Sequence, residues 1–325
     1  MNFTVKYRRR NGDKLSDKSE KTKAFILMCI LVCMWGLDYI VAKKALEVLG
    51  TMNLLFLKYL IGLLLVLAIK LKKKVKTLIR LKDIPFFILC SLTGEILYYY
   101  CDYTAMSYLP VSIITVILAF VPVLSILIER VIFKKRFTAK ILIGILVCVV
   151  GVGIVIGADF RLLLNGRLIG YILAFGSVIS WNMYNFITAH LSEHYESIAV
   201  TFNQLLCTLL IVSPYAIHTM PPMETFTPSI MVGVLYLGLG SVGAGFLIMV
   251  RGLKALGPTI SAMFSNFLPV TATFFGWLFL KESLSPMQVA GGIIVILSSC
   301  IVIREKGKLD ELSDKEKNDE PDGGV

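Results

Sequence analysis

The chain has 325 residues, of which 56% are hydrophobic and 17% are charged, and its formal net charge is +11. A soluble domain of this size has no means of hiding so much apolar surface, so the composition excludes an ordinary soluble protein and indicates a polytopic membrane protein. The positive charge would suit a nucleic-acid partner, but the distribution of the basic residues argues against one.

A membrane crossing needs about 20 predominantly apolar residues. By this criterion the sequence predicts an all-α protein with ten transmembrane helices. We expect them at residues 24–42, 52–69, 84–105, 111–133, 141–157, 168–188, 197–216, 229–250, 258–280 and 286–303. Residues 1–23 are expected to form a basic cytoplasmic tail, because the apolar stretch that follows is too long for the core of a signal peptide. Residues 304–325 are charged and are expected to form a disordered cytoplasmic tail.

The second half of the chain repeats the first. The segment that starts at Phe120 aligns without a gap to a segment 147 positions later, and Trp35 pairs with Trp181 at an offset of 146. We therefore divide the membrane part into two five-helix repeats, at 24–157 and 168–303. Five is an odd number, so the second repeat must enter the membrane from the opposite side. Inverted repeats of this kind are typical of alternating-access transporters.

Basic residues gather on one predicted side of the membrane. If the N-terminus is cytoplasmic, the inside segments carry 26 Lys and Arg and the outside segments carry five. The positive-inside rule then predicts a multi-pass protein of the cell membrane with both termini in the cytoplasm. The basic run at 70–82 is interpreted as a topology determinant that also contacts anionic lipid. This pattern makes the lipid bilayer the expected partner and excludes nucleic acid.

Two short motifs have simpler explanations than the chemistry they suggest. Residues 190–194 read HLSEH, a match to the H-x-x-E-H pattern of zinc proteases in which Glu193 would be the base. A catalytic zinc needs a third protein ligand, so we expect a short water-facing connection between helices. Residues 238–243 read GLGSVG, but they fall inside an apolar helix, where glycines allow close packing. We predict no catalytic residue, no metal and no cofactor, and the chain has no Walker-type loop for ATP.

Six charged side chains fall inside the predicted membrane segments. Glu129 and Arg130 close their helix at the cytoplasmic headgroups and are interpreted as anchors, which leaves Asp38, Lys58, Glu95 and Asp102 in the membrane interior. Such groups are costly to bury and are functional candidates for that reason. Lys58 is the natural counter-ion of Asp38 or of one of the other acids, either as a structural ion pair or as a gate or partner of a substrate carboxylate. Glu95 is nearest the membrane centre and is either a polar wall or a proton-coupling group. Glu95 and Asp102 are the coupling candidates, with the proton as the ion.

The spacing of the third predicted helix places Glu95, Tyr98, Tyr99 and Asp102 on one face. A face with two carboxylates and two phenols is expected to point at a cavity rather than at lipid. The second repeat contributes amides and a tryptophan, which suit a small polar organic substrate, although each amide alone could serve as an interhelical hydrogen bond. The candidate cavity residues are Trp35, Asp38, Lys58, Tyr99, Trp181, Asn185 and Asn266.

Four stretches together resemble EamA-type transporters of the drug/metabolite transporter superfamily. They are WGLDYIVAKKAL at 35–46, the pair Lys58-Tyr59, and the segments 105–129 and 251–296. The resemblance extends over about residues 24–303. It implies ten helices in two inverted five-helix units and the export of amino acids and other small metabolites without ATP. The chain departs from the family pattern at Lys58, where an arginine is usual, and at Asp38, where the residue is commonly small or neutral.

The leading hypothesis is therefore a secondary transporter that exports a small polar metabolite, such as an amino acid, by alternating access, and that is not an enzyme. One alternative is a membrane-embedded metal-dependent hydrolase that uses HLSEH. Another is a non-transporting sensor or lipid-handling protein on the same scaffold. A transporter should be damaged by Lys58→Ala or Glu95→Gln, whereas a sensor of that kind should tolerate both.

Overall fold

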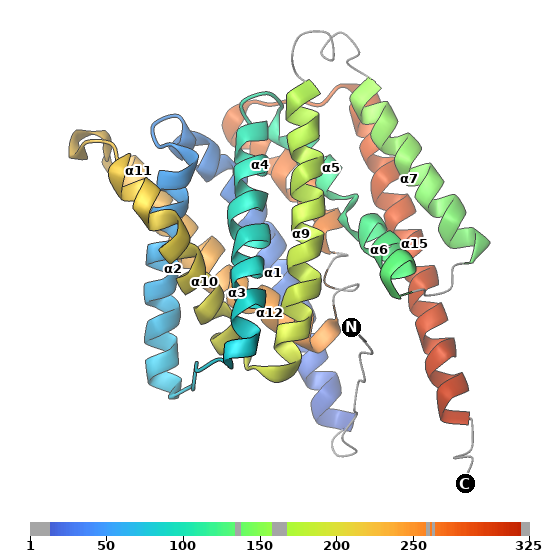
Figure 1. The fold of residues 1–325 in the computed structure, drawn as a ribbon. Coiled ribbons are helices and arrows are strands. Elements are labelled where there is room, and N and C mark those ends of the chain that lie inside the picture. The colour runs from blue at the N-terminus through green and yellow to red at the C-terminus, as the bar shows by residue number, and fades with distance from the viewer. Residues whose placement is uncertain (1–13, 134–137, 158–167, 258–260, 262–263, 320–325) are drawn as a thin grey trace.

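The computed structural model describes the chain except for residues 1–13, 134–137, 158–167, 258–260, 262–263 and 320–325 (Figure 1). The described residues form helices and short connections, with no strand among them. A helix satisfies its backbone hydrogen bonds within its own segment, which is what an apolar membrane requires of a chain that crosses it.

The first half of the described chain contains α1 (Lys14–Leu46), α2 (Thr51–Lys73), α3 (Ile84–Cys90), α4 (Tyr98–Ala105), α5 (Val111–Leu118), α6 (Val121–Phe133) and α7 (Ala139–Gly157). The second half contains α9 (Leu168–His194), α10 (Ser197–His218), α11 (Pro228–Tyr236), α12 (Gly245–Leu256), α14 (Leu268–Phe275) and α15 (Pro286–Asp319). Three π-helical segments continue these helices, namely η2 (Ser91–Leu97), η4 (Leu237–Ala244) and η6 (Gly276–Leu280). The 3-10 segment η5 (Phe264–Phe267) precedes α14.

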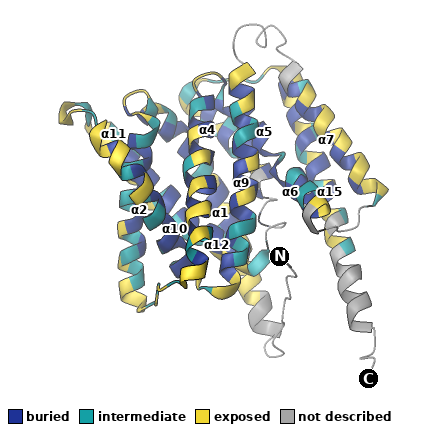
Figure 2. Ribbon diagram, viewed as in Figure 1, coloured by how far each residue is buried: buried dark blue, intermediate teal, exposed yellow. Residues whose placement is uncertain are grey.

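Within the described ranges, seven helical segments are long and apolar enough to cross a membrane, and two shorter apolar helices lie at 139–155 and 268–280. Large apolar side chains such as Phe25, Leu64 and Trp277 are more than half exposed. Exposed residues lie on the outer faces of the helices, and buried residues face the interior (Figure 2). An apolar exterior over so many helices is the surface that lipid covers. The fold is that of a polytopic membrane protein.

Irregular helical turns recur at equivalent places in the two halves. The π-helical segment η2 joins α3 to α4, and η4 joins α11 to α12. Ser91, the first residue of η2, lies 146 positions before Leu237, the first residue of η4. This is the same offset that relates Trp35 to Trp181. A π turn disturbs the regular helical register and is often found at functional sites, so its recurrence draws attention to these two helices.

Equivalent helices also exchange partners. Helix α1 packs against α12 and α14, and its equivalent α9 packs against α4, α5 and α6. Helix α2 packs against its own equivalent α10, and α7 packs against α15. Helix α1 begins and α15 ends on the same side of the helical bundle (Figure 1). The two halves therefore share one core, which lies along α1 and α9.

The C-terminal segment differs from the sequence prediction. Residues from 304 onward are expected to be disordered, but α15 continues to Asp319. Its charged part is rich in Lys and Glu, which are good helix formers. Glu305 and Lys308 add an ion pair one turn apart, with 2.7 Å between Oε1 and Nζ. The apolar criterion used for the prediction finds membrane crossings and cannot detect such a polar helical extension.

Candidate functional site

A buried cavity lies between the two halves of the molecule. The first half of the chain contributes α1, α4, α5 and α6 to its walls, and the second half contributes α9, α12, η5 and α14. The polar and aromatic side chains among its lining are Trp35, Asp38, Tyr39, Tyr98, Tyr99, Trp181, Ser261 and Phe264. Its volume is about 30 Å³, which is room for one or two water molecules. The helices must separate before a larger solute can enter.

Aromatic rings form much of the wall of this cavity. Trp35 and Trp181 meet edge to face, with ring centroids 5.6 Å apart. Tyr98 lies against Trp181 at 4.8 Å and against Tyr99 at 4.9 Å. The indole Nε1 of Trp35 donates to the backbone oxygen of Ser241 in η4 at 3.4 Å. Edge-to-face packing of this kind holds each ring in a defined orientation.

Lys58 is fully buried in α2 and makes no direct ion pair among the described residues. Its Nζ donates to the hydroxyl of Tyr103 at 2.7 Å, and that hydroxyl donates to Oδ2 of Asp38 at 3.4 Å. The same Nζ lies 3.2 Å from the centre of the Tyr99 ring, in a cation–π contact. The predicted association of Lys58 with Asp38 therefore runs through a phenol rather than through a direct ion pair.

The buried acids are incompletely hydrogen-bonded. In the part of the chain that the structure describes, Oδ1 of Asp38 and both carboxylate oxygens of Asp102 have no hydrogen-bond partner. Asp38 is 3% exposed and Asp102 is not exposed at all. Buried polar atoms are almost always hydrogen-bonded, so these oxygens are candidates for binding water, a proton or a ligand. The hydroxyls of Ser241 and Tyr39 lie close to Asp38 and Asp102, respectively.

Glu95 lies apart from the cavity. It belongs to η2, where its Oε2 accepts a hydrogen bond from the hydroxyl of Thr208 on α10, while Oε1 has no partner among the described residues. The neighbouring Gly94 packs directly against the ring of Tyr184, since a Cβ at residue 94 would come within 2.0 Å of Tyr184 Cδ2. The π-helical turn thus brings α9 and α10 close to the backbone around Glu95.

The structure brings together only part of the site predicted from the sequence. Trp35, Asp38, Tyr99 and Trp181 line the cavity. The other candidates, which the described lining does not include, are Lys58, Glu95, Asp102, Asn185 and Asn266. Of these, Lys58 still touches the cavity wall through Tyr99.

The two predicted amides of the second half have different surroundings. Asn185 is buried, and neither amide atom has a hydrogen-bond partner within the described ranges. Asn266 is fully buried, and its Nδ2 donates to Sγ of Cys300 at 3.9 Å. Both lie inside the protein, as expected for polar groups in a membrane helix, and the structure gives Asn266 the interhelical contact that was the simpler alternative.

Three participating residues escaped the sequence analysis. Tyr39 lines the cavity, and its hydroxyl lies 3.1 Å from that of Tyr98. Tyr103 links Lys58 to Asp38, and its position four residues after Tyr99 on the same helix is a signal that could have identified it. Thr208 has no such signal, because its contact with Glu95 joins residues 113 positions apart.

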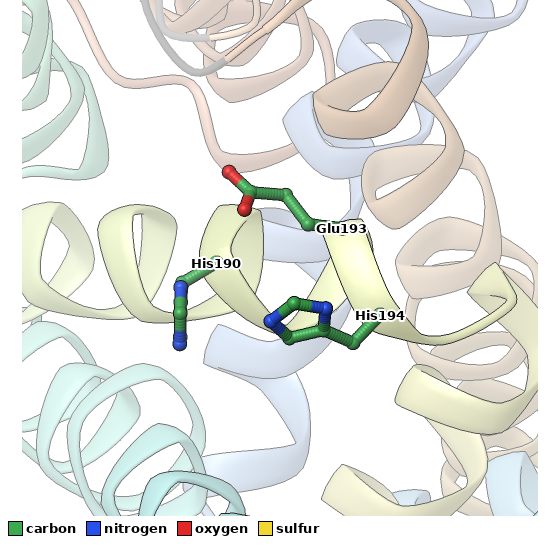
Figure 3. A group of neighbouring side chains, drawn as sticks. All are labelled: His190, Glu193 and His194. Carbon is green, nitrogen blue, oxygen red and sulfur yellow. The ribbon is translucent and has the colours of Figure 1, made fainter. Parts of the chain in front are cut away.

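The HLSEH segment is helical rather than a connection. Residues 190–194 form the last turns of α9, because α9 ends at His194, and the prediction of a short connection was wrong. The candidate ligand atoms of His190, Glu193 and His194 all lie within 4.8 Å of one another (Figure 3). Glu193 and His194 are exposed. If Glu193 were the third ligand, the motif would have no residue left to act as base.

The GLGSVG segment packs as the sequence analysis expected. A Cβ at Gly238 would lie 2.5 Å from Cβ of Ile61 and 3.1 Å from the backbone oxygen of Lys58. The glycine therefore allows η4 to approach α2 closely. The interpretation as a packing motif is confirmed.

Helices with apolar outer faces around an interior that holds polar groups are typical of membrane transport proteins, and the comparisons with known proteins agree. The chain belongs to the EamA-like transporter family, which matches residues 22–157 and again residues 168–304. This confirms the resemblance to the drug/metabolite transporter superfamily that the sequence motifs indicated.

Relatives extend over most of the chain. An uncharacterized transporter, YvbV of Bacillus subtilis, is 24% identical over 287 residues, which is 87% of this chain and 92% of that protein. The riboflavin transporter ImpX of Fusobacterium nucleatum is 21% identical over 85% of this chain and 96% of its own length. A solved crystal structure of a protein matches with a TM-score of 0.63 at 18% identity and covers 86% of this chain and 96% of that chain. That last similarity concerns the fold alone.

Proposed function

We propose that this protein is a secondary transporter of the cell membrane that exports a small polar metabolite, such as an amino acid, without ATP. The observation that carries the proposal is the position of the cavity, whose aromatic walls come from both family-matched halves of the chain. A site between two halves can be opened to either side in turn when the halves rock against each other.

The architecture that we propose is ten crossings in two inverted five-helix repeats, at 24–157 and 168–303, with both termini cytoplasmic. Three observations support it. The family matches the chain twice, the π-helical segments recur at the offset of 146, and equivalent helices exchange partners between the halves. The start of α1 and the end of α15 on one side of the bundle agree with an even number of crossings (Figure 1).

We further propose that a proton is the coupling ion, with Glu95 and Asp102 as its acceptors. Both side chains are fully buried, and both have carboxylate oxygens without a partner in the described part of the chain. A buried carboxyl group in a membrane helix is a common proton relay. The fixed hydrogen bond from Thr208 to Glu95 leaves the other oxygen of Glu95 free to take the proton.

Transport into proteoliposomes tests the proposal. Purified protein reconstituted with an imposed proton gradient should accumulate at least one member of a panel of radiolabelled amino acids, amines and nucleosides. Trp181→Ala, which removes a cavity wall, should abolish that uptake. If no solute moved in either direction and none changed the thermal stability of the protein, the transporter proposal would be wrong.

The same preparation separates transport from the alternative functions. Uptake that survives the double substitution His190→Ala and His194→Ala excludes any need for the HLSEH group. Uptake that survives both Lys58→Ala and Glu95→Gln would instead show that the buried charges are not part of the transport mechanism. Cysteine tags near residues 14 and 319, labelled from outside intact cells, test the proposed cytoplasmic ends.

A further inference from the structure

The described wall of the cavity contains one carboxyl group and no basic side chain that could pair with it. Among the described lining residues Asp38 is the only acid, and no Lys, Arg or His accompanies it. Its side chain is 3% exposed, and its Oδ1 has no hydrogen-bond partner within the described ranges. The cavity therefore offers an incoming solute a buried hydrogen-bond acceptor with negative character.

The nearest buried cation is already engaged. Lys58 lies against the Tyr99 ring, with Nζ 3.2 Å from the ring centre, and donates to Tyr103. Tyr99 lines the cavity, whereas Lys58 does not appear among its described lining residues. A carboxylate on a solute would reach the ammonium group only after displacement of Tyr99. The geometry thus disfavours the role of Lys58 as a direct partner of a substrate carboxylate.

The walls around Asp38 suit an organic ammonium group. Trp35, Trp181, Tyr98 and Tyr99 all line the same cavity. The face of an aromatic ring attracts a cation, and tryptophan and tyrosine do so most strongly when water is excluded. Inorganic cations such as Mg²⁺ prefer a cage of several carboxylate or carbonyl oxygens. The described lining has one carboxylate, the hydroxyls of Ser261 and of three tyrosines, and a wall made mainly of aromatic rings.

The charge balance of the interior points the same way. Three buried acids, Asp38, Glu95 and Asp102, lie near enough to the buried base Lys58 for their charges to act on it. Asp83 and Glu129 are the other buried acids among the described residues. Uncompensated charge is costly in a membrane interior. A cationic solute reduces the excess of acidic groups, whereas an anionic solute adds to it. The electrostatic preference of the site is therefore for a cation.

We propose that the cavity binds a small organic amine in its protonated, cationic form, with an apolar or aromatic body. The ammonium group lies between Trp35 and Trp181 and donates a hydrogen bond to Oδ1 of Asp38. A carboxylate on the solute is not needed for binding. This inference deepens the proposed function, because it names the solute class for the same cavity, and it depends on the helices separating to enlarge that cavity.

Binding is measured with three probes that share one aromatic body. Phenethylamine is a cation, phenylalanine a zwitterion and 3-phenylpropionate an anion. Trp277 is 63% exposed and remote from the cavity lining, so Trp277→Phe leaves Trp35 and Trp181 as the only tryptophans and makes indole fluorescence a local reporter. We expect phenethylamine to bind about tenfold or more tighter than phenylalanine, and 3-phenylpropionate to bind more weakly than both.

Two variants test the role of the carboxylate. Asp38→Asn keeps the size of the side chain and should weaken phenethylamine binding about tenfold or more. Glu47→Gln, the same chemical change at an exposed site just after α1, should leave binding unchanged. Equal affinity of the Asp38→Asn variant and the parent protein would overturn the proposal, as would tighter binding of phenylalanine or 3-phenylpropionate.

A competition assay on the otherwise unaltered protein covers the case in which Asp38→Asn does not fold. Ethylammonium chloride, whose N–H groups can donate to Asp38, should displace phenethylamine, whereas sodium chloride at the same ionic strength should not. Displacement by both salts alike would contradict a specific ammonium site.

Transport distinguishes this inference from the proposed function. If anionic metabolites alone were transported, the amine site would be refuted and the transporter would stand. If amines bound but no solute of the wider panel moved, the transporter proposal would be the one that failed.

Discussion

Trp35 and Trp181 occupy equivalent positions in the two halves of the chain, 146 residues apart, and their rings meet edge to face with centroids 5.6 Å apart. One ring comes from α1 and the other from α9, the helix that is equivalent to α1. Both line the cavity. Any rocking of the halves must change this contact, because it lies on the surface that they share.

The first prediction concerns Trp181. Its ring packs against Trp35, Tyr98, Tyr184 and Phe246, so Trp181→Ala leaves a void among four aromatic side chains. We expect the free energy of unfolding to fall by about 3–5 kcal/mol, the usual loss for a buried aromatic residue. Unfolding in detergent, followed by circular dichroism, measures it. The control Trp277→Ala removes an outward-facing ring, 63% exposed, and an equal loss there would contradict the assigned packing.

The second prediction concerns Lys58. Lys58→Met removes the one base that the structure buries beside Asp38, and we expect a loss of about 3–5 kcal/mol because the acid is left uncompensated. Adding Asp38→Asn to the same chain should recover part of that stability, since no buried charge then remains in the relay through Tyr103. Thermal unfolding of the single and double variants makes the comparison. A double variant less stable than Lys58→Met would show that the two groups do not interact.

The third prediction separates coupling from solute binding. Glu95→Gln keeps the hydrogen bond with Thr208 but removes the site for a proton. We expect the variant to lose uptake driven by a proton gradient and to keep solute exchange between the two sides of a vesicle. Both are measured with the same labelled solute.

Thr208→Val should alter the pH dependence of transport, whereas Ser213→Ala, which removes a hydroxyl from the same helix α10, should not. Full proton-driven uptake by Glu95→Gln would exclude Glu95 as the coupling group.

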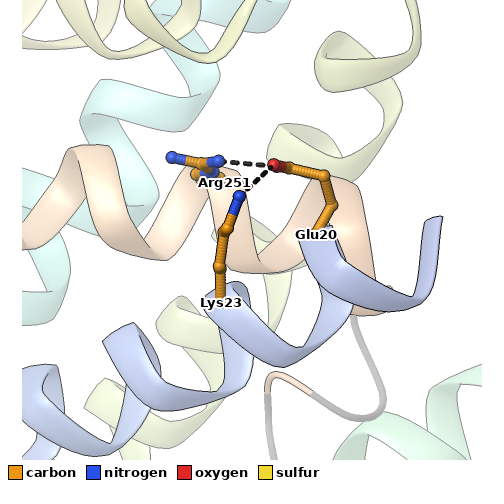
Figure 4. Close-up of polar contacts among 3 residues, drawn as sticks. All are labelled: Glu20, Lys23 and Arg251. Carbon is orange, nitrogen blue, oxygen red and sulfur yellow. Dashed lines mark hydrogen bonds and ion pairs between the residues drawn. The ribbon is translucent and has the colours of Figure 1, made fainter. Parts of the chain in front are cut away.

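The fourth prediction concerns the ion pairs near the two ends of α1. Glu20 pairs with Arg251 at 2.6 Å and lies near Lys23, whereas Lys43 pairs with Glu282 at 2.6 Å (Figure 4 shows the first group). At 1.5 Å per residue, Glu20 and Lys43 are about 35 Å apart along the helix. The Glu20–Arg251 side chains are 46–47% exposed, so Arg251→Gln should leave stability nearly unchanged.

The pair at the other end is more enclosed, with side chains 30% and 13% exposed. We expect Glu282→Gln to destabilise the protein more than Arg251→Gln. High salt should weaken the exposed pair further and affect the enclosed pair less. Unfolding at low and high salt gives both comparisons, and a larger effect from Arg251→Gln would contradict the burial of these groups.

The fifth prediction uses two glycines in helical segments. A Cβ at Gly94 would overlap the ring of Tyr184, whereas a Cβ at Gly153 in α7 would meet nothing within 4 Å. Gly94→Ala should therefore destabilise the protein and disturb Glu95, because the ring or the π-helical turn must move. Gly153→Ala should be neutral or stabilising by up to about 1 kcal/mol, since alanine favours the helix. Thermal unfolding of both variants checks the pair, and equal effects would contradict the close approach of α9 to η2.

The sequence was a good guide to the helices and a partial guide to the site. Long apolar segments and a fixed offset sufficed to place the helical segments, and the resemblance of four sequence stretches indicated the family. The sequence predicted that Glu95, Tyr98, Tyr99 and Asp102 share one face that points at a cavity. Tyr98 and Tyr99 do line the cavity, but the two acids are not among its described lining residues. Glu95 belongs to the π-helix η2, so regular helical spacing does not describe its position relative to the two tyrosines. Asp102 shares the regular helix α4 with the tyrosines, and it is buried without lining the cavity.

Membrane crossings and repeats can be deduced from the chain alone, because they depend on composition and on distance along the sequence. Contacts between side chains depend on how each helix is turned about its axis and on which helix lies beside it. No spacing in the sequence brings Thr208 to Glu95, inserts Tyr103 between Lys58 and Asp38, or covers the Lys58 ammonium group with Tyr99. Those three contacts arise from packing between helices, and they leave Asp38 as the charged group that faces the cavity.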